Sequence, residues 1–569
     1  MVHDGDIRNL LVLIYGDREG GRAAERILRL MDAFPTKPVS DTDSGFFSES
    51  DVILITYGDS IRQRGVPSLV TLKRFVETHL EGVFSAIHLL PFYPYSSDDG
   101  FSVIDFHKVD PKIGSWEDIS DLNEHYELMF DYVLNHISAQ SEWFQNYLAG
   151  ISGYRQLAIE VDPDADLSMV VRPRALPLLT EFQKIDGPPV HVWTTFSADQ
   201  IDLNYKSLDV LEHMVRVLLF YVEQGATMLR LDAVAYLWKE LGTPCIHLDK
   251  THAMVKLFRK ILDRVAPGVR LITETNVPHP ENISYFGDGY NEAQMVYNFT
   301  LPPLLLHTFL TQNSSDLTCW TAGFEQGTAT TTFFNFTASH DGIGVRPLEG
   351  ILPDGSVDRL ASHVLENGGL ISYKRNPDGS ESPYELNVTY VDALYDHRMA
   401  DGDPLHAERF LASQTIQLSF PGVPGIYVHS VLGSRNWTDG VASTGRARTI
   451  NREKPLLSDI TKNLKDPDGL RHQIFYPYTH RIRIRRGQPA FHPNSGCRVL
   501  ELDPRVFAIE RTCPQQTIYA LTNVTSENVD LTLSEPAGSD PLVDLISGRE
   551  TGASPIRLDP YQSVWLTHL

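Results

Sequence analysis

Between about residues 51 and 430 the chain repeats one pattern, a short apolar run followed by a longer amphipathic stretch. Apolar runs rich in β-branched and aromatic residues predict buried strands, and stretches with apolar residues three and four positions apart predict helices. The helical stretches end in Gly or Pro, which are typical helix stops; examples are SLDVLEHMVRVLLFYVEQG and THAMVKLFRKILDRVAPG. The apolar runs are VILITY, AIHLLPF, LMFDYVLNH, ATMLRLDAV, RLITETN, MVYNFTL, FFNFTASHD and PGIYVH.

These eight alternations of strand and helix favour a (β/α)8 TIM barrel, an α/β fold, over an open doubly wound sheet. A nucleotide-binding sheet would carry a Gly-rich turn after a strand, and neither GxGxxG nor GxxxxGK[ST] occurs. We therefore predict a barrel over residues 51–490.

Four segments depart from the repeat. Residues 1–50 combine an amphipathic helical pattern, GGRAAERILRLMDAF, with the polar stretch KPVSDTDSG, and predict an N-terminal helical extension. A long interruption after the third strand, residues 138–200, predicts an inserted subdomain, and residues 342–390 read as a second, loop-rich stretch. Over residues 491–569, short alternating runs separated by turn residues predict a small C-terminal antiparallel β domain.

Charge and composition narrow the possible partners. The formal net charge is −24, which repels the phosphate backbone of nucleic acids, so no nucleic-acid partner is expected. No apolar stretch reaches the roughly 20 residues that span a bilayer, and no basic, apolar leader precedes the first helix. Four scattered cysteines without CxxC spacing suggest reduced thiols. These features predict a cytoplasmic protein without a membrane partner, present as a monomer or homodimer.

Acidic residues close three of the predicted strands. In the run MLRLD, Arg230 and Asp232 point to the same face, into the barrel, and the cation keeps the neighbouring carboxylate ionised. Glu274 closes the next strand and Asp341 closes the seventh. Barrel enzymes carry their chemistry at these strand ends, and retaining glycoside chemistry needs a carboxylate nucleophile and a carboxylic acid about 5 Å apart. A single such acid could equally be a helix cap or a loop ion pair; three in order favour catalysis.

Four motifs in order, VLNH, RLDAV, ITETN and ASHD, resemble the signature regions of the α-amylase family of glycoside hydrolases and transglycosylases. The resemblance covers about residues 51–490, and the small C-terminal β domain is consistent with it. Within the family, LITYGDS, LPFYPYSSDDGFSVIDFHKVD, RLDAVAYLWKELGT, PPLLLH and HDGIGV resemble the sucrose phosphorylase group.

The resemblance implies a role for each strand-end acid and for a set of binding residues. Asp232 would be the nucleophile, Glu274 the general acid/base and Asp341 the residue that stabilises the transition state. Taken alone, several of the binding residues have plainer structural interpretations, since His136 suits a strand cap, Phe196 a core position and Asp98 a turn. Arg446 and Arg452 compete with Arg448 for its role. The implied glucosyl-binding residues are Asp98, Phe101, His136, Phe196, Gln200, Arg230, His340 and Arg448.

The acceptor side decides between hydrolysis, transglycosylation and phosphorolysis. Inorganic phosphate as co-substrate would need cations; the resemblance places Arg172 and Arg174 beside the acceptor pocket, and their alternative is a surface ion pair. The other implied acceptor-side residues are Tyr236, Asn276, Tyr384 and Glu385.

Departures from sucrose phosphorylases, among them Asn276 in place of a His, point to the branch acting on glucosylglycerol, glucosylglycerate or sucrose 6-phosphate. Lys374 and Arg375 could bind an anionic acceptor, but Glu381 and Glu385 offset their charge. This mixed charge favours glycerol, and we predict reversible phosphorolysis of 2-O-α-glucosylglycerol to glucose 1-phosphate. Glucosylglycerate, sucrose and sucrose 6-phosphate remain alternative substrates.

Two further alternatives are an α-glucosidase or transglucosidase, which shares every barrel motif, and a non-catalytic barrel, which would typically have lost an acid. Neither HExxH nor paired-His spacing occurs, so no metal or bound cofactor is expected. The acidic run DPDAD at residues 162–166 offers a calcium site or, more simply, a solvated loop.

Overall fold

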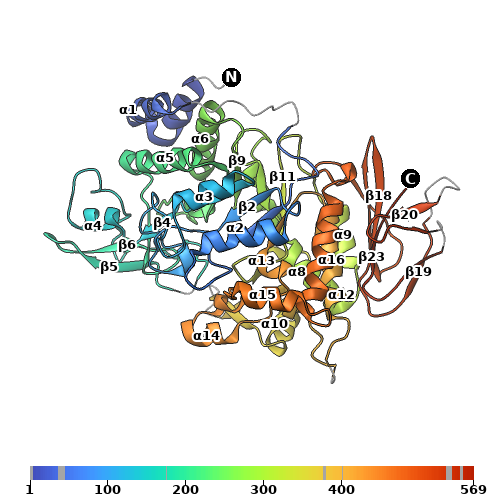
Figure 1. Ribbon diagram of the computed structural model, residues 1–569. Helices are drawn as coiled ribbons and strands as arrows, with labels where there is room; N and C mark the ends of the chain where they lie inside the picture. The colour runs from blue at the N-terminus through green and yellow to red at the C-terminus, as the bar shows by residue number, and fades with distance from the viewer. Residues whose placement is uncertain are drawn as a thin grey trace.

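The computed structural model describes residues 4–35, 45–174, 176–375, 380–399, 402–533, 541–551 and 555–568. Its centre is a closed barrel of eight parallel strands (Figure 1), and each of the eight predicted apolar runs supplies one of them. The prediction of a (β/α)8 barrel is therefore confirmed. In chain order the barrel strands are β1 (Ile53–Thr56), β2 (Ala86–Leu89), β3 (Glu127–Tyr132), β8 (Ala226–Leu231), β9 (Arg270–Thr273), β10 (Met295–Tyr297), β11 (Thr332–Asn335) and β15 (Val423–Tyr427).

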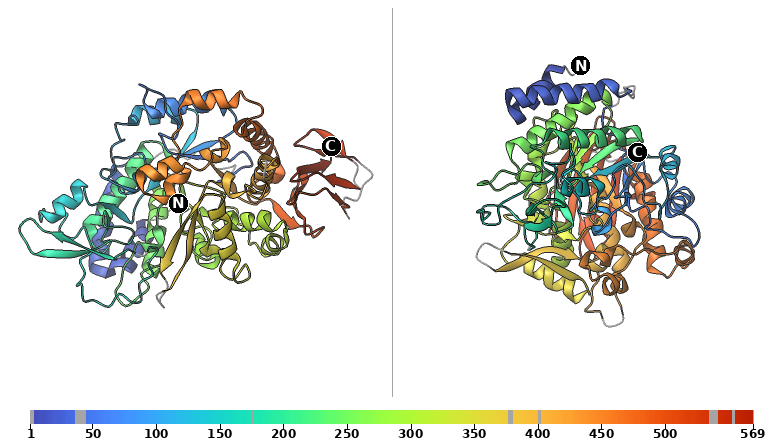
Figure 2. Two further views of the ribbon diagram at one scale, coloured as in Figure 1. Left: turned by 90° about the horizontal axis from the view of Figure 1, so that it is seen from below. Right: turned by 90° about the vertical axis from the view of Figure 1, so that its left-hand side faces the viewer.

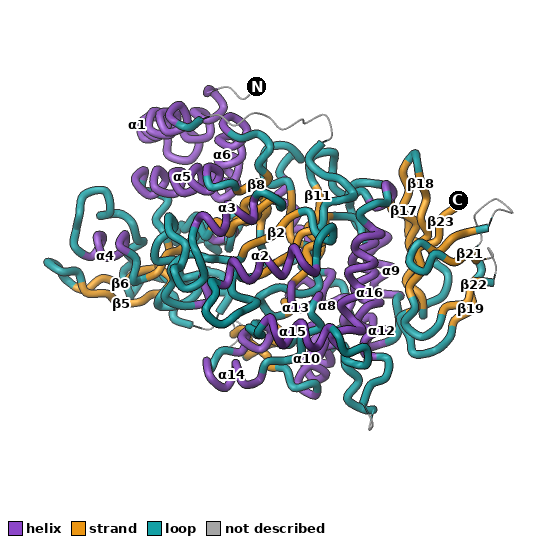
Figure 3. The backbone as a smooth tube through the Cα atoms, in the orientation of Figure 1, coloured by secondary structure: helices purple, strands orange, loops and turns teal. Residues whose placement is uncertain are grey.

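Helices surround the barrel (Figure 3), and their apolar faces pack against the outer side of the strands. The strands are buried almost throughout because both of their faces are covered, as expected for a parallel sheet. The helices between and after the barrel strands are α2 (Ser68–His79), α3 (Trp116–Asn123), α5 (Leu208–Glu223), α6 (Asp249–Val265), α7 (His279–Ile283), α8 (Leu301–Thr311), α9 (Ser315–Ala322), α12 (His406–Ser419), α13 (Val428–Val431), α14 (Thr438–Thr444), α15 (Leu457–Leu464) and α16 (Leu470–Arg485).

The insertion after the third barrel strand begins and ends in a short antiparallel pair, β4 (His136–Ser138) with β7 (Gln200–Asp202). Between these strands lie α4 (Glu142–Leu148) and a hairpin of β5 (Leu179–Gln183) and β6 (Pro189–Trp193). The β4–β7 pair therefore ties both ends of the insertion together beside the barrel mouth.

The stretch after the seventh barrel strand is more regular than the loop-rich stretch that the sequence suggested. It contains α10 (Ser356–Glu366) and a three-stranded antiparallel sheet in the order β12 (Ile343–Gly344), β14 (Glu381–Asn387), β13 (Leu370–Arg375), followed by α11 (Tyr390–Ala393). β12 has only two residues, β13 (LISYKR) lacks a regular alternation of apolar and polar residues, and β14 (ESPYELN) contains a proline, so the sequence did not predict strands here.

The N-terminal helix α1 (Asp4–Ala33) begins well before the predicted amphipathic segment and bends at Gly16, whose φ is 79°. The two arms cross closely, because a Cβ at Gly20 would lie 2.5 Å from the Cα of Val12. The helix packs against α5 and α6 (Figure 2, right). The polar stretch KPVSDTDSG falls almost entirely outside the described residues.

The chain ends in antiparallel sheets that lie at the opposite end of the molecule from the β5–β6 hairpin (Figure 2, left). One sheet has the order β16-β17-β18-β23-β20-β21, and a second pairs β19 with β22. No helix in the described ranges is both long and apolar enough to cross a membrane. The strand bounds are β16 (Gly496–Val499), β17 (Val506–Cys513), β18 (Gln516–Asn523), β19 (Val529–Leu531), β20 (Leu542–Asp544), β21 (Arg549–Thr551), β22 (Ile556–Leu558) and β23 (Ser563–His568).

Candidate active site

The three predicted strand-end acids line one cavity at the carboxyl ends of the barrel strands. Asp232 directly follows β8 and Glu274 directly follows β9, while Asp341 lies in the segment between β11 and β12. Ala233 has the left-handed φ of 50°, which turns the backbone sharply after Asp232 and is an uncommon conformation for a residue with a side chain. The fold thus brings together acids from three separate strands.

Arg230 connects two of these acids. Its Nη1 donates to Oδ1 of Asp232 at 2.7 Å, and its Nη2 lies 3.7 Å from Oε2 of Glu274. The guanidinium is itself held by an ion pair with Asp131, its partner in register on β3, and Asp131 also bonds Nε2 of His88 at 2.8 Å. Arg230 is 1% exposed, so its charge acts on both acids with little screening by water.

The surroundings give these two acids different protonation states. Burial, and after it the charges of Asp232 and Asp341, raises the pKa of Glu274 to about 7 against the opposing effect of Arg230. Burial also raises the pKa of Asp232, but the guanidinium in direct contact with it favours the ionised form. The pKa of both acids is raised, so the distances to Arg230, 2.7 Å from Asp232 and 3.7 Å from Glu274, assign the negative charge of the pair to Asp232 and the proton to Glu274.

Asp341 is held ionised on the opposite side of the cavity. Its burial would raise its pKa, but Arg448, His340 and Arg452 outweigh that effect and hold the pKa well below its usual value. Nη1 of Arg448 lies 2.5 Å from Oδ1 of Asp341. Arg448, and not its competitors, contacts the acid most closely: Arg452 lies 3.8 Å from Asp341 and pairs with Asp99, and Arg446 lines an adjoining cavity instead.

The predicted glucosyl-binding side chains form the inner wall of the same cavity. The rings of Phe101 and His340 stack at 4.7 Å, and Nε2 of His136 lies 3.0 Å from the carbonyl oxygen of Phe101 and 3.1 Å from Nε2 of Gln200. Burial lowers the pKa of His136, and that of His340 to about 3, so both rings are neutral. Neutral imidazoles and carboxylates present the hydrogen-bonding groups that sugar hydroxyls require.

Asp98 also lines the inner wall, at the start of a single turn in which both Asp98 and Asp99 have positive φ. The turn suggested by the sequence is therefore present, and it directs the two side chains apart. Asp98 lies 3.3 Å from Arg174, whereas Asp99 pairs with Arg452.

The predicted acceptor-side residues lie in the same cavity. Tyr236, Asn276, Tyr384 and Glu385 all line the cavity, and Phe196 packs edge-on against Tyr236 at 5.5 Å between ring centroids. Both oxygens of Glu385 are occupied, by Nε and Nη2 of Arg448 at 3.1 and 2.8 Å and by the backbone N–H of Gly342 at 3.0 Å.

The two predicted phosphate-binding arginines are placed differently. Arg174 lines the cavity, with its guanidinium 5.6 Å from the ring of Phe196. Arg172 is exposed and does not line the cavity, so the structure does not support its predicted contact with phosphate. In an extended segment, residues two positions apart would share a face, but the chain bends at Pro173 and Arg174, and the two arginines therefore need not point the same way.

Sequence reasoning missed three residues of the site. Phe299 lines the cavity beyond β10; as an apolar residue in an apolar run it reads as core, although its position after a barrel strand was a usable signal. Asp131 and His88 hold Arg230 from within the barrel. Both residues lie inside strands and not at strand ends. The only sequence signal for them is that their side chains point into the barrel.

Comparisons with known proteins agree with this geometry. Residues 81–340 match the family model for the α-amylase catalytic domain. Glucosylglycerate phosphorylase of Spirochaeta thermophila is 49% identical over 526 residues, which cover 91% of this chain and 89% of the relative.

The chain belongs to the α-amylase family.

Within the α-amylase family, the similarity is to phosphorylases. Glucosylglycerol phosphorylase of Marinobacter adhaerens is 30% identical over 77% of this chain and 88% of its own length. The crystal structure of a sucrose 6F-phosphate phosphorylase from Thermoanaerobacter thermosaccharolyticum superposes with a TM-score of 0.74 at 24% identity, over 90% of this chain and 98% of that one. The chain is accordingly an enzyme of the glycosyltransferase type that includes these phosphorylases.

Proposed function

We propose that the protein catalyses the reversible phosphorolysis of 2-O-α-glucosylglycerate to α-glucose 1-phosphate and glycerate, with retention of configuration. One observation carries the proposal: Asp232, Glu274 and Asp341 line a single cavity, and one guanidinium contacts both the first and the second. This is the acid pairing that a double displacement requires.

In the first displacement, the ionised carboxylate of Asp232 attacks the anomeric carbon while Glu274 donates its proton to the glycosidic oxygen. Glycerate leaves, and a β-glucosyl ester forms on Asp232. In the second displacement, a phosphate oxygen attacks the same carbon and breaks the ester bond, and Glu274, now ionised, accepts the phosphate proton. Asp341 stabilises the positive charge that develops on the sugar in both transition states.

The charges around the acceptor side support an anionic acceptor and remove the reason for preferring glycerol. Lys374 pairs with Glu349 at 3.3 Å and does not line the cavity, and the side chain of Arg375 lies outside the described residues. Glu381 is exposed at the far end of the β13–β14 hairpin. The acceptor therefore does not contact the mixed charges of this loop.

The cations that do reach the cavity come from elsewhere. Arg174 lines the cavity, Arg446 lines an adjoining cavity that shares Arg174, Tyr384 and Glu385 with it, and Arg446 has no ion-pair partner among the described residues. Glu385 is the acceptor-side acid, and its oxygens accept from the N–H of Gly342 and from Arg448, whose positive charge it shares with Asp341. A glycerate carboxylate and an incoming phosphate both favour such cations. The greater similarity to the glucosylglycerate phosphorylase than to the glucosylglycerol phosphorylase supports the same choice.

The test compares substrates directly. The purified enzyme is incubated with glucosylglycerate, glucosylglycerol, sucrose or sucrose 6-phosphate, each with and without inorganic phosphate, and glucose 1-phosphate and free glucose are measured. We expect phosphate-dependent release of α-glucose 1-phosphate, fastest from glucosylglycerate. Equal or faster release from glucosylglycerol would overturn the acceptor assignment, and glucose release at the same rate without phosphate would overturn phosphorolysis itself.

A further inference from the structure

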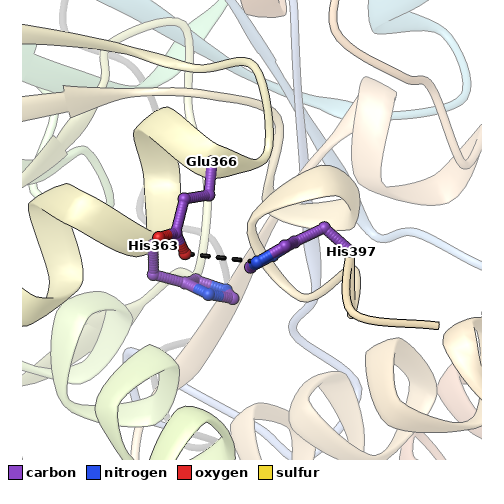
Figure 4. A group of neighbouring side chains, drawn as sticks. All are labelled: His363, Glu366 and His397. Carbon is purple, nitrogen blue, oxygen red and sulfur yellow. Dashed lines mark ion pairs between the residues drawn. The ribbon is translucent and has the colours of Figure 1, made fainter.

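A group of three potential metal ligands lies away from the active-site cavity, at His363, Glu366 and His397 (Figure 4). His363 and Glu366 are three positions apart on α10, so they share one face of the helix. His397 comes from the loop after α11. Each side chain offers one ligand atom, and the three atoms lie within 4.8 Å of one another; among the described residues this is the one group of its kind.

The neighbouring amide of Asn367 fixes how the two imidazoles are protonated. Its Nδ2 donates to the carbonyls of Asp392 at 3.0 Å and Tyr395 at 2.9 Å. An amide nitrogen carries two hydrogens, so both are used, and the third neighbour of Nδ2, Nε2 of His363 at 3.1 Å, receives none. The orientation of the amide is thereby set, and its Oδ1 faces His397.

Each ring therefore carries its proton on the nitrogen that faces a carbonyl oxygen. Nδ1 of His397 lies 3.2 Å from Oδ1 of Asn367, and Nε2 of His363 lies 2.8 Å from the carbonyl of Ala393. In the neutral state the other nitrogen of each ring presents a lone pair. A histidine with one N–H bonded to a carbonyl and the other nitrogen free is the arrangement found at metal sites.

The distance between two of the ligand atoms suits a small cation. Nε2 of His397 lies 3.3 Å from Oε2 of Glu366. Bonds of about 2.0–2.2 Å to a tetrahedral ion place its ligand atoms about 3.3 to 3.5 Å apart. Arg398, next to His397 in the chain, is neutralised by Asp396, to which its Nε and Nη2 donate at 2.7 and 2.8 Å.

We propose that His363, Glu366 and His397 form a binding site for one divalent transition metal ion of the zinc class, with water completing its coordination. Two imidazoles and a carboxylate are ligands that zinc prefers over calcium or magnesium. The ion joins the end of α10 to the segment after α11. Between these two segments of the chain lies β14, whose Tyr384 and Glu385 line the cavity. The bound ion therefore stabilises the acceptor side of the enzyme from outside the cavity.

The competing explanation is an ordinary ion pair between protonated His397 and Glu366. Isothermal titration of tag-free, chelator-treated enzyme with Zn²⁺ distinguishes the two. We expect one ion per chain in the unsubstituted enzyme, and binding at least about tenfold weaker in the Glu366→Gln and His397→Asn variants. The side chains of His363, Glu366 and His397 are all at least partly exposed, so these variants should fold. Circular dichroism checks this.

The matched control is His125→Asn, because His125 is an exposed histidine 3.8 Å from a single glutamate, Glu77, with no second imidazole in its group. This variant should bind Zn²⁺ as the unsubstituted enzyme does. Zn²⁺ should also raise the melting temperature of the unsubstituted enzyme and of the control, but not of Glu366→Gln, because an ion that binds only the folded state stabilises it. Equal Zn²⁺ binding by the unsubstituted enzyme and Glu366→Gln would overturn the proposal.

Discussion

At the scale of single residues, the site depends on how one guanidinium is shared. Arg230 contacts Asp232 at 2.7 Å and Glu274 at 3.7 Å. This difference in distance assigns the charge to the first acid and the proton to the second, because an opposite charge favours the ionised form more strongly the closer it lies. Two similar carboxyl groups thereby become nucleophile and acid.

Loss of the nucleophile should abolish turnover without loss of the fold. Asp232→Asn keeps the size of the side chain and can still accept a hydrogen bond from Arg230, but its amide is not a nucleophile. We expect phosphorolysis to fall by at least about 10³-fold. A steady-state assay of glucose 1-phosphate release measures this, and Asp166→Asn, which alters an exposed loop acid, should leave the rate unchanged. A residual rate within tenfold of normal would remove Asp232 from this role.

The pKa of Glu274 predicts the alkaline side of the pH profile. Glu274 must be protonated for glycerate to leave, and its pKa is about 7. As pH rises through that value the acid loses its proton, so kcat/KM for glucosylglycerate should fall about tenfold per pH unit. Consumption of α-glucosyl fluoride, whose leaving group needs no proton, should not show this decline. A decline of the same size with both substrates would point to a different titrating group.

At the scale of elements, the three-stranded sheet after the seventh barrel strand supplies the acceptor side. Gly344 on β12 lies in register with Glu385 on β14, and a Cβ at Gly344 would lie 2.4 Å from the amide of Asn276. Because Gly344 has no side chain, the sheet can approach Asn276, which lies in the segment after β9. The position of Asn276 in the cavity depends on this close approach.

Gly344→Ala tests that dependence. The added methyl group should displace Asn276 or the sheet and raise the KM for glycerate in the synthetic direction by about tenfold, a cost of about 1.4 kcal/mol. The KM for glucose 1-phosphate should change less, because the three atoms nearest the added methyl group all belong to Asn276 and none to a predicted glucosyl-binding side chain. Gly21→Ala, where a Cβ meets nothing within 4 Å, is the matched control. An unchanged KM for glycerate would show that the contact has no bearing on the acceptor.

The sequence predicted most of the barrel and much of the site because both follow from periodic patterns. Strand runs such as VILITY and RLITETN are buried on both faces, and the acids at their ends are placed by the barrel geometry itself. The region between β12 and β14 was not predicted, because β13 lacks a regular alternation of apolar and polar residues and β14 contains a proline. The exposure of Arg172 and the proximity of His363 to His397 were not predicted either. Both depend on how the segments pack in the fold, which spacing along the chain does not encode.

At the scale of the whole molecule, the N-terminal helix is a structural addition remote from the chemistry. The buried residues of α1 pack against α5 and α6 on the outside of the barrel, and none of them lines the active-site cavity. Its contribution should therefore appear in stability and not in turnover.

Ile27→Ala separates these two properties. Ile27 is 1% exposed, and removing its buried carbons should lower the free energy of unfolding by about 3 kcal/mol. Urea denaturation measures the loss, while kcat should stay within twofold of normal. Leu13→Ala, at a position 68% exposed on the same helix, should have little effect on either. A large fall in kcat without loss of stability would connect α1 to the active site.

The central claim is that the acids after β8 and β9 act on one anomeric carbon through a covalent intermediate. The most direct measurement is mass spectrometry of the Glu274→Gln enzyme after reaction with α-glucosyl fluoride and proteolysis. Without the acid/base, the ester should form faster than it is released and accumulate. We predict a gain of one glucosyl group on the peptide that contains Asp232. A glucosyl group on any other peptide would contradict the account, as would complete turnover of the fluoride with no trapped adduct.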